Sequence, residues 1–457
     1  MNPEFRRNLW LEFNDHRLIA MPVILGAIFL LSYLLSGEIG QGTGKIATLC
    51  YAIIIFLWGT RMAAESVLQE VHNRTWDLQR MSAISAWQMA WGKLFGATSY
   101  AWYGALMCLG VYVISYGGIL PFDVLLISVL LYIGSGVFAH AVCLLVSLQT
   151  NQRRGTLGRV QVMSYQFLGL ICAIPPLYSG LAGYGGDGVY RMITWYGEQF
   201  SLSIFMLLAL TAFMLWSLVG VFALMRVELQ QHNKPWFWLC FVGFAMVYFT
   251  GIHFTPPKFA VFLAPFPGNA STVYIVAVIA TYIMVFSEPK DQVQFHRLNQ
   301  FMQTGKWAQA FSQAPRSILT LPIVIGAGVT VAAFSEVTLV QGFVHVIDGR
   351  VAVIASILFV IRDVAFVYFM SLGQSDGRGG NQGDGRALLY LVLLYTVVPS
   401  LLAALHLKPL VAFFWPQYGP APLLTLLPIL IEVVVMFYLL RRRVRTQADR
   451  LAPQKFS

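Results

Sequence analysis

The sequence predicts an all-α integral membrane protein, a polytopic bundle of about twelve transmembrane helices. Of its 457 residues, 58% are hydrophobic and only 11% are charged, whereas about a quarter of the residues in soluble proteins are charged. Apolar runs of transmembrane length alternate with polar gaps along the chain. The net charge of +10 comes mostly from Lys and Arg in these gaps, which is typical of membrane topology rather than of nucleic-acid binding.

Residues 1–17 are expected to form an amphipathic helix at the membrane interface. Phe5, Leu9 and Phe13 recur at helical spacing, while Arg6 and Arg7 lie elsewhere on the helical wheel. A helical extension of the first span explains the same pattern equally well. In both cases the two arginines predict that the N-terminus is cytoplasmic.

The apolar runs give about twelve candidate spans when each requires roughly 20 residues. They cover residues 18–35, 46–68, 95–116, 122–148, 160–178, 201–225, 236–254, 259–286, 318–340, 351–372, 387–407 and 420–440. With this count both termini are cytoplasmic, and the cytoplasmic gaps hold most of the Lys and Arg. Because these cationic gaps occur without an organellar targeting peptide, we expect a multi-pass protein of a bacterial inner (plasma) membrane.

The predicted organisation has two membrane regions. After the interfacial helix, residues 18–226 form a core of about six spans, and residues 227–442 add about six more. The second region contains a cytoplasmic segment, 287–317, whose apolar residues again have helical spacing. Residues 443–457 are the predicted cytoplasmic tail.

The polar gap after the second span is expected to contain a short surface helix. Glu70 and Arg74 are four residues apart, and Asp77 and Arg80 are three apart, which favours helical ion pairs. Trp76 lies between them, and a large amphipathic ring on such a segment normally inserts into lipid headgroups or contacts a partner protein. We therefore expect a partner or the membrane to cover Trp76.

This gap resembles the region between the second and third spans of ATP-binding-cassette (ABC) transporter permeases of the type-2 exporter class. The resemblance extends over residues 1 to about 226 and is carried by Glu70, Thr75, Trp76, Asp77, Ser82, Ser85, Gly92 and Lys93. It implies that the segment is a coupling helix that docks on a separate soluble ATPase subunit. The implied docking residues are Glu70, Thr75, Trp76, Asp77 and Arg80.

The same resemblance implies a permease subunit that exports a substrate and works as a homodimer or with a sister permease. The chain has no Gly-x-x-x-x-Gly-Lys-[Ser/Thr] phosphate-binding loop. ATP and Mg²⁺ are therefore expected on the partner ATPase, and no cofactor is expected on this chain. Membrane lipid is a further expected partner, and nucleic acid is not expected.

Three ionisable residues are predicted to lie near the middle of the bilayer: Arg362, Asp363 and Glu432. Charges at this depth are costly and are usually paired or functional. Arg362 and Asp363 are adjacent and project about 100° apart on a helix, so we predict that Arg362 pairs with Glu432 instead. A structural ion pair and a polar point on a transport path both explain these residues.

Two other functional classes remain open. A proton-coupled secondary transporter would also have about twelve spans and could use Asp363 or Glu432. A membrane-embedded enzyme is disfavoured because the sequence shows no clustered catalytic or metal-ligating residues, and none are assigned. The five cysteines all lie within apolar runs and predict neither a zinc site nor a disulfide framework.

Overall fold

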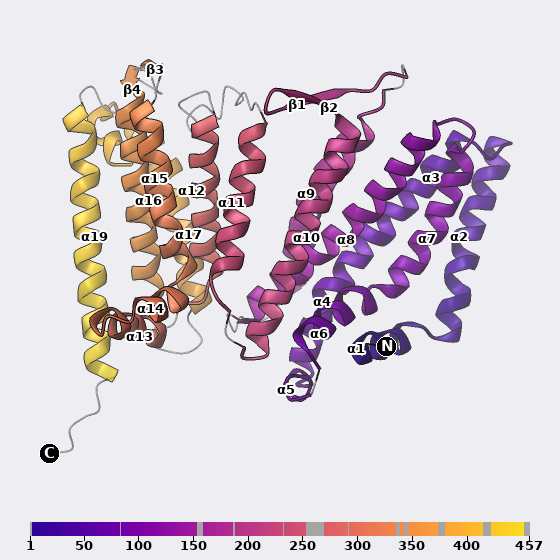
Figure 1. Cartoon of the computed structure of the whole chain (residues 1–457), viewed down its shortest axis with the longest axis horizontal. Coiled ribbons are helices and arrows are strands. Elements are labelled where there is room, and N and C mark those ends of the chain that lie inside the picture. The colour runs from indigo at the N-terminus through magenta and orange to yellow at the C-terminus, as the bar shows by residue number, and fades with distance from the viewer. Residues whose placement is uncertain are drawn as a thin grey trace. The chain divides into compact units, whose positions relative to one another are not determined.

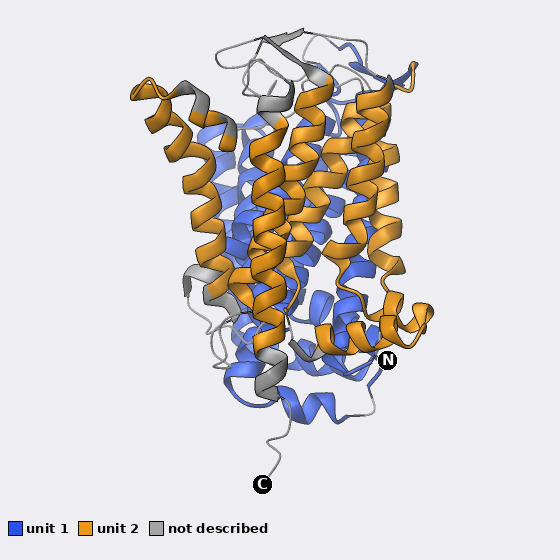
Figure 2. Ribbon diagram, turned by 90° about the vertical axis from the view of Figure 1, so that its left-hand side faces the viewer, with its two compact units in different colours: residues 1–194, 198–233 blue, residues 195–197, 234–457 orange. Residues whose placement is uncertain are grey.

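The computed structural model describes residues 2–82, 84–152, 159–185, 188–231, 233–252, 269–290, 292–334, 339–341, 346–372, 380–414 and 422–451. Helices dominate these residues, and two short β-hairpins are the only sheets among them (Figure 1). The predicted all-α class is therefore confirmed. The chain forms two compact units, residues 1–194 with 198–233 and residues 195–197 with 234–457 (Figure 2). This division falls close to the predicted boundary at residue 226.

Unit 1 contains a short N-terminal helix followed by long apolar helices. Its elements are α1 (Pro3–Glu12), α2 (Asp15–Ser36), α3 (Gln41–Ala52), η1 (Ile53–Gly59), α4 (Thr60–His72), α5 (Trp76–Arg80), α6 (Ala86–Trp91), η2 (Gly92–Gly96), α7 (Ser99–Tyr116), α8 (Phe122–Gln152), α9 (Arg159–Leu181), β1 (Met192–Trp195), β2 (Glu198–Ser201) and α10 (Leu202–Glu228). A core cluster that includes Tyr51, Leu131 and Leu210 packs these helices together.

Unit 2 has a second apolar core, which includes Val324, Val353 and Val367. Its elements are α11 (Trp236–Gly251), α12 (Asn269–Ser287), α13 (Gln292–Gln303), α14 (Trp307–Gln313), α15 (Arg316–Phe334), β3 (Leu339–Gln341), β4 (Val346–Asp348), α16 (Gly349–Ser371), α17 (Gly380–Val392), η4 (Leu393–Val397), α18 (Val398–Ala404), η5 (Lys408–Phe413) and α19 (Pro422–Leu451). The strands β3 and β4 pair antiparallel, with Val340 opposite Ile347.

Within the described ranges, nine helices are long and apolar enough to cross a bilayer, and the bent pair α6–η2 and α7 makes ten. Two further helices lie outside this count: α11, which is apolar but has only 16 residues, and α19. The described residues thus form a multi-pass helical membrane protein. The count of about twelve spans stays a prediction.

The second predicted span is one continuous helix with a π-helical segment at its centre. α3, η1 and α4 together run from Gln41 to His72. A π-helical turn displaces backbone groups from the regular hydrogen-bond pattern, and here Nε2 of buried His140 in α8 lies 3.0 Å from the carbonyl oxygen of Ile55. Gly59 leaves room for this ring, because a Cβ atom there would lie 2.4 Å from His140 Nε2.

The third predicted span is bent by 51° between η2 and α7. α1 crosses the start of this span at two glycines. A Cβ atom at Gly92 would lie 2.6 Å from Glu4 Cγ, and one at Gly96 would lie 2.8 Å from Asn8 Cβ. Asn8 also donates a hydrogen bond of 3.2 Å to the carbonyl oxygen of Gly92. α1 is thus a separate helix docked on the third span.

Several predicted loops contain regular structure. The Gly-rich gap after the fifth predicted span carries the β1–β2 hairpin, and the segment 287–317 forms the expected helices in α13 and α14. The Gly-rich loop before residue 387 is shorter than predicted, because α17 already begins at Gly380. The predicted tail at 443–457 continues α19 as helix to Leu451, and residues 452–457 lie outside the described part.

Candidate functional site

α5 is a five-residue helix at the end of unit 1 where α1 also lies (Figure 1). The preceding helix ends because Arg74 adopts a left-handed backbone conformation, with φ 58°, a common way to end a helix. Asp77 occupies the first turn of α5 and Arg80 the last, as the helix dipole favours. Their side chains are 3.4 Å apart, so the predicted Asp77–Arg80 pair is present.

Trp76 faces inward from α5 and is only 4% exposed. Its indole Nε1 donates a hydrogen bond of 3.2 Å to Glu228 Oε2 at the end of α10. Lys93 Nζ lies 5.2 Å from the centre of the same ring, within the range of a cation–π interaction. The expectation that lipid or a partner covers Trp76 is therefore wrong, because unit 1 itself covers the ring.

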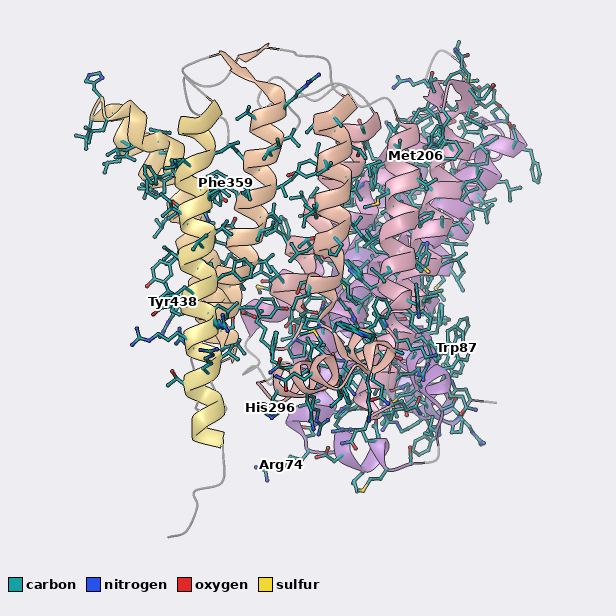
Figure 3. The ribbon with its side chains drawn as sticks, turned by 60° about the vertical axis from the view of Figure 1, so that its left-hand side comes forward. Arg74, Trp87, Met206, His296, Phe359 and Tyr438 are labelled. Atoms are coloured by element: carbon teal, nitrogen blue, oxygen red, sulfur yellow. The ribbon has the colours of Figure 1, made fainter. Side chains whose placement is uncertain are left out.

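Four charged side chains form a cluster beneath Trp76: Glu4, Arg7, Glu70 and Lys93. Lys93 Nζ lies 3.2 Å from Glu4 Oε1 and also bonds Glu70, while Arg7 contacts both acids. Lys93 and Glu4 are almost fully buried. The predicted Glu70–Arg74 pair gives way to these partners, because Arg74 projects away from the bundle (Figure 3). Two acids and two bases balance, which limits the cost of burying them.

The outward face of α5 carries both polar and apolar side chains. Thr75 and Asp77 are exposed, and so are Leu78 at 67% and Met81 at 77%. Of the five predicted docking residues, Thr75 and Asp77 therefore face outward and Trp76 and Glu70 face inward. The fifth, Arg80, is partly exposed. Sequence reasoning missed Leu78 and Met81, although apolar residues in a polar gap were a visible signal.

Unit 2 brings together all three predicted intramembrane charges on α16 and α19, which pack side by side (Figure 3). Arg362 Nη1 lies 2.5 Å from Glu432 Oε2, so this predicted pair is confirmed. The expectation that neighbouring Asp363 cannot neutralise Arg362 is wrong: Nε and Nη2 of Arg362 donate to Asp363 Oδ1 at 2.9 and 2.7 Å. The long arginine side chain folds back along the helix and removes the 100° separation that the argument relied on.

Two tyrosines complete this network. The hydroxyl groups of Tyr282 and Tyr395 donate to Asp363 Oδ2 at 2.6 and 2.7 Å. The guanidinium carbon of Arg362 also lies 4.5 Å from the ring centre of Phe359. Asp363 is fully buried and its carboxylate accepts four hydrogen bonds, whereas Glu432 is half-buried. The formal charge of the three ionisable groups is −1.

A second polar cluster in unit 2 escaped the sequence reasoning. Glu288 accepts hydrogen bonds from the backbone N–H groups of Arg316 and Ser317, which open α15. Lys290 Nζ lies 2.7 Å from Asp384 Oδ1. These contacts join the start of α15 to α12 and tie the chain after α12 to α17, and they satisfy groups that a helix end leaves unpaired.

Neither site has the composition of a metal centre. Across the described residues, no group of three His, Cys, Asp or Glu side chains is placed to hold a metal ion. Comparison with protein-family models, with curated proteins and with solved structures finds no match to this chain. The two charged networks and the exposed face of α5 are therefore the candidate functional features of this chain.

Proposed function

We propose that this chain is the membrane-spanning permease subunit of an ABC-type transporter, exporting a substrate with ATP hydrolysed by a separate soluble ATPase. The observation that carries the proposal is the arrangement of α5. It is a short helix with one open face, and Trp76 anchors its other face to the bundle. The resemblance in residues 1 to about 226 favours the same function.

The anchoring gives α5 a mechanical role. Through Glu228 the ring of Trp76 contacts α10, and through Lys93 it contacts the cluster that joins α1, α4 and η2. A displacement of α5 by a closing ATPase would thus reach four elements of unit 1. We assign docking to Thr75, Asp77, Leu78 and Met81, and transmission to Trp76. The proposal further includes a homodimer or a sister permease, and a bacterial inner membrane with cytoplasmic termini.

The proposal predicts that a soluble ATPase is encoded beside this chain, and the test co-expresses the two proteins and purifies them in lipid nanodiscs. Leu78→Asp with Met81→Asp should weaken ATPase binding at least tenfold. Met302→Asp, on exposed α13, is the matched control and should leave binding unchanged. Trp76→Phe keeps an aromatic ring but loses the bond to Glu228, so it should retain binding and lower substrate-coupled ATP hydrolysis. Unaltered binding in the Leu78/Met81 variant would refute the docking assignment.

Proton-coupled transport is a second candidate, favoured by the network of Asp363, Arg362 and Glu432. Its formal charge of −1 lies in a span where an uncompensated charge costs roughly 2.5–3.5 kcal/mol, and one bound proton would neutralise it. Transport into sealed vesicles separates the two functions. ATP with the ATPase drives transport under the first proposal, whereas an imposed proton gradient alone drives it under the second.

A further inference from the structure

Unit 1 contains a half-open cavity of about 330 Å³ between α3, α7, α8, α9 and α10. It lies at the end of unit 1 where the β1–β2 hairpin precedes α10, opposite α5 (Figure 1). Its size falls within the range of roughly 300–1,000 Å³ that is usual for small-molecule sites. Neither the α5 site nor the charge cluster beneath it contributes a side chain to this cavity.

Tyrosine is the commonest residue in the walls of the cavity. Tyr112 and Tyr116 of α7 and Tyr132 of α8 line it together with Tyr184 and Tyr190. The ring centres of Tyr112 and Tyr132 are 5.3 Å apart with their planes at 74°, and those of Tyr184 and Tyr190 are 5.2 Å apart. Such edge-to-face pairs hold rings in fixed orientations. The cavity is therefore preorganised to contact an apolar or ring-shaped body.

One wall of the cavity forms where α7 packs closely against α3. A Cβ atom at Gly44 would lie 2.3 Å from Tyr116 Cε2, so only glycine lets this ring lie against α3. On the floor, Tyr112 donates a hydrogen bond of 3.1 Å to Ser128, which donates in turn to the carbonyl oxygen of Leu125. These hydroxyl groups are satisfied within the protein.

Two charged side chains, Asp123 and Lys45, lie near the opening of the cavity. Asp123 accepts a hydrogen bond from a cavity residue, whereas Lys45 has no acidic partner among the described residues. Tyr190 donates a hydrogen bond of 2.7 Å to Asp123 Oδ2. That bond raises the pKa of the Tyr190 phenol, which keeps the hydroxyl group neutral and the acid occupied. Lys45, in the first turns of α3, lines the cavity and is exposed. In the part of the chain that the structure describes, no carboxylate lies within ion-pair distance of Lys45.

We propose that this cavity binds an anionic amphiphile, with the anionic group at Lys45 and the apolar or ring-shaped body among the tyrosines. An uncompensated cation beside aromatic walls favours a ligand of this composition over a neutral or cationic one. Two sources supply this chemistry: the headgroup region of an anionic membrane lipid and a soluble organic anion. The proposal goes beyond the transport function, because binding here requires no ATPase.

Photolabelling of the full chain in phosphatidylcholine nanodiscs tests it. The probes are phosphatidylglycerol with a diazirine near its headgroup, and 4-benzoylbenzoate as a soluble ring-bearing anion. Phosphatidylcholine with the same diazirine and uncharged benzophenone are their neutral counterparts. Peptides of α3, α7 and α8 are analysed by mass spectrometry. An anionic probe should label these peptides at least fivefold more than its neutral counterpart, and Lys45→Gln should remove that preference.

Two matched variants control for folding and for charge. Lys45→Arg should retain the preference, and Lys306→Gln, which removes a cation from the loop before α14, should leave it intact. Labelling by the lipid probe alone identifies a lipid site, and labelling by the soluble probe alone identifies a solute site. Equal labelling by charged and neutral probes, labelling confined to other peptides, or a preference that survives Lys45→Gln would overturn the proposal.

Discussion

Arg362 shows how one long side chain satisfies several buried groups at once. It donates to Asp363, to Glu432 and to the hydroxyl oxygen of Tyr395, while its guanidinium plane lies over Phe359. Arginine suits this position because its donors form a fixed planar fork. The two acids are not equivalent, since Asp363 is enclosed and accepts four bonds, whereas Glu432 has one hydrogen-bond partner in the described structure.

This difference predicts a graded set of stability losses. Asp363→Asn should destabilise the protein by about 3–5 kcal/mol, the usual cost of breaking a buried ion pair, and Glu432→Gln should cost less because Glu432 is half-buried. Arg362→Gln combined with Glu432→Gln should lose less than the sum of the two single variants. Unfolding of purified protein in detergent, analysed as a double-mutant cycle, measures this. Strictly additive losses would show that Arg362 and Glu432 do not interact.

At the scale of elements, two glycines, Gly92 and Gly96, let α1 pack closely against the third span. Glu4 and Asn8 face the third span, and Trp10 is largely exposed. The burial of Glu4 and Asn8 beside exposed Trp10 and Leu11 is the reverse of the pattern in an ordinary soluble amphipathic helix. α1 ends at Glu12 and the first span begins separately at Asp15, so the alternative of a helical extension of the first span is wrong.

Gly92→Ala should therefore loosen α1. The added Cβ atom would lie 2.6 Å from Glu4 Cγ and 2.8 Å from the backbone nitrogen of Phe5, so we expect a loss of about 1–3 kcal/mol, as for overpacking. Gly110→Ala in α7 is the control, because nothing lies within 4 Å of a Cβ atom there. Thermal unfolding and proteolysis near residue 13 report the effect. Equal stability of the two variants would contradict the packing of α1.

At the scale of the whole molecule, each unit has its own core, so the orientation of each unit in the membrane is considered separately. Within unit 1, α5 and the β1–β2 hairpin lie at opposite ends of the helices (Figure 1). The excess of Lys and Arg in the gaps on the α5 side predicts that this end is cytoplasmic. Lys93 is buried and paired with acids in the cluster beneath Trp76, whereas Arg74 is exposed and Arg80 is partly exposed.

Single-cysteine labelling tests this orientation. In a background without the five native cysteines, Leu78→Cys should react only from the cytoplasmic side, because it lies on the exposed face of α5. Gln199→Cys, exposed on β2, should react only from the opposite side. Ala139→Cys, fully buried in α8, should react from neither. Reaction of positions 78 and 199 from the same side would remove the assigned number of spans between them.

The sequence by itself determined the class of the protein, most helix positions and the residues worth examining. These depend on sums over neighbouring residues: apolar length decides a span, and local spacing decides a short helix. Even the Arg362–Glu432 pair could be predicted from depth in the bilayer, because the depth of a residue follows from the number of residues between it and the start of its span. The tertiary structure decided which way each side chain faces. Trp76 meets Glu228 across 152 residues and Arg7 meets Glu70 across 63, and no local pattern encodes such partners, because helix packing sets them.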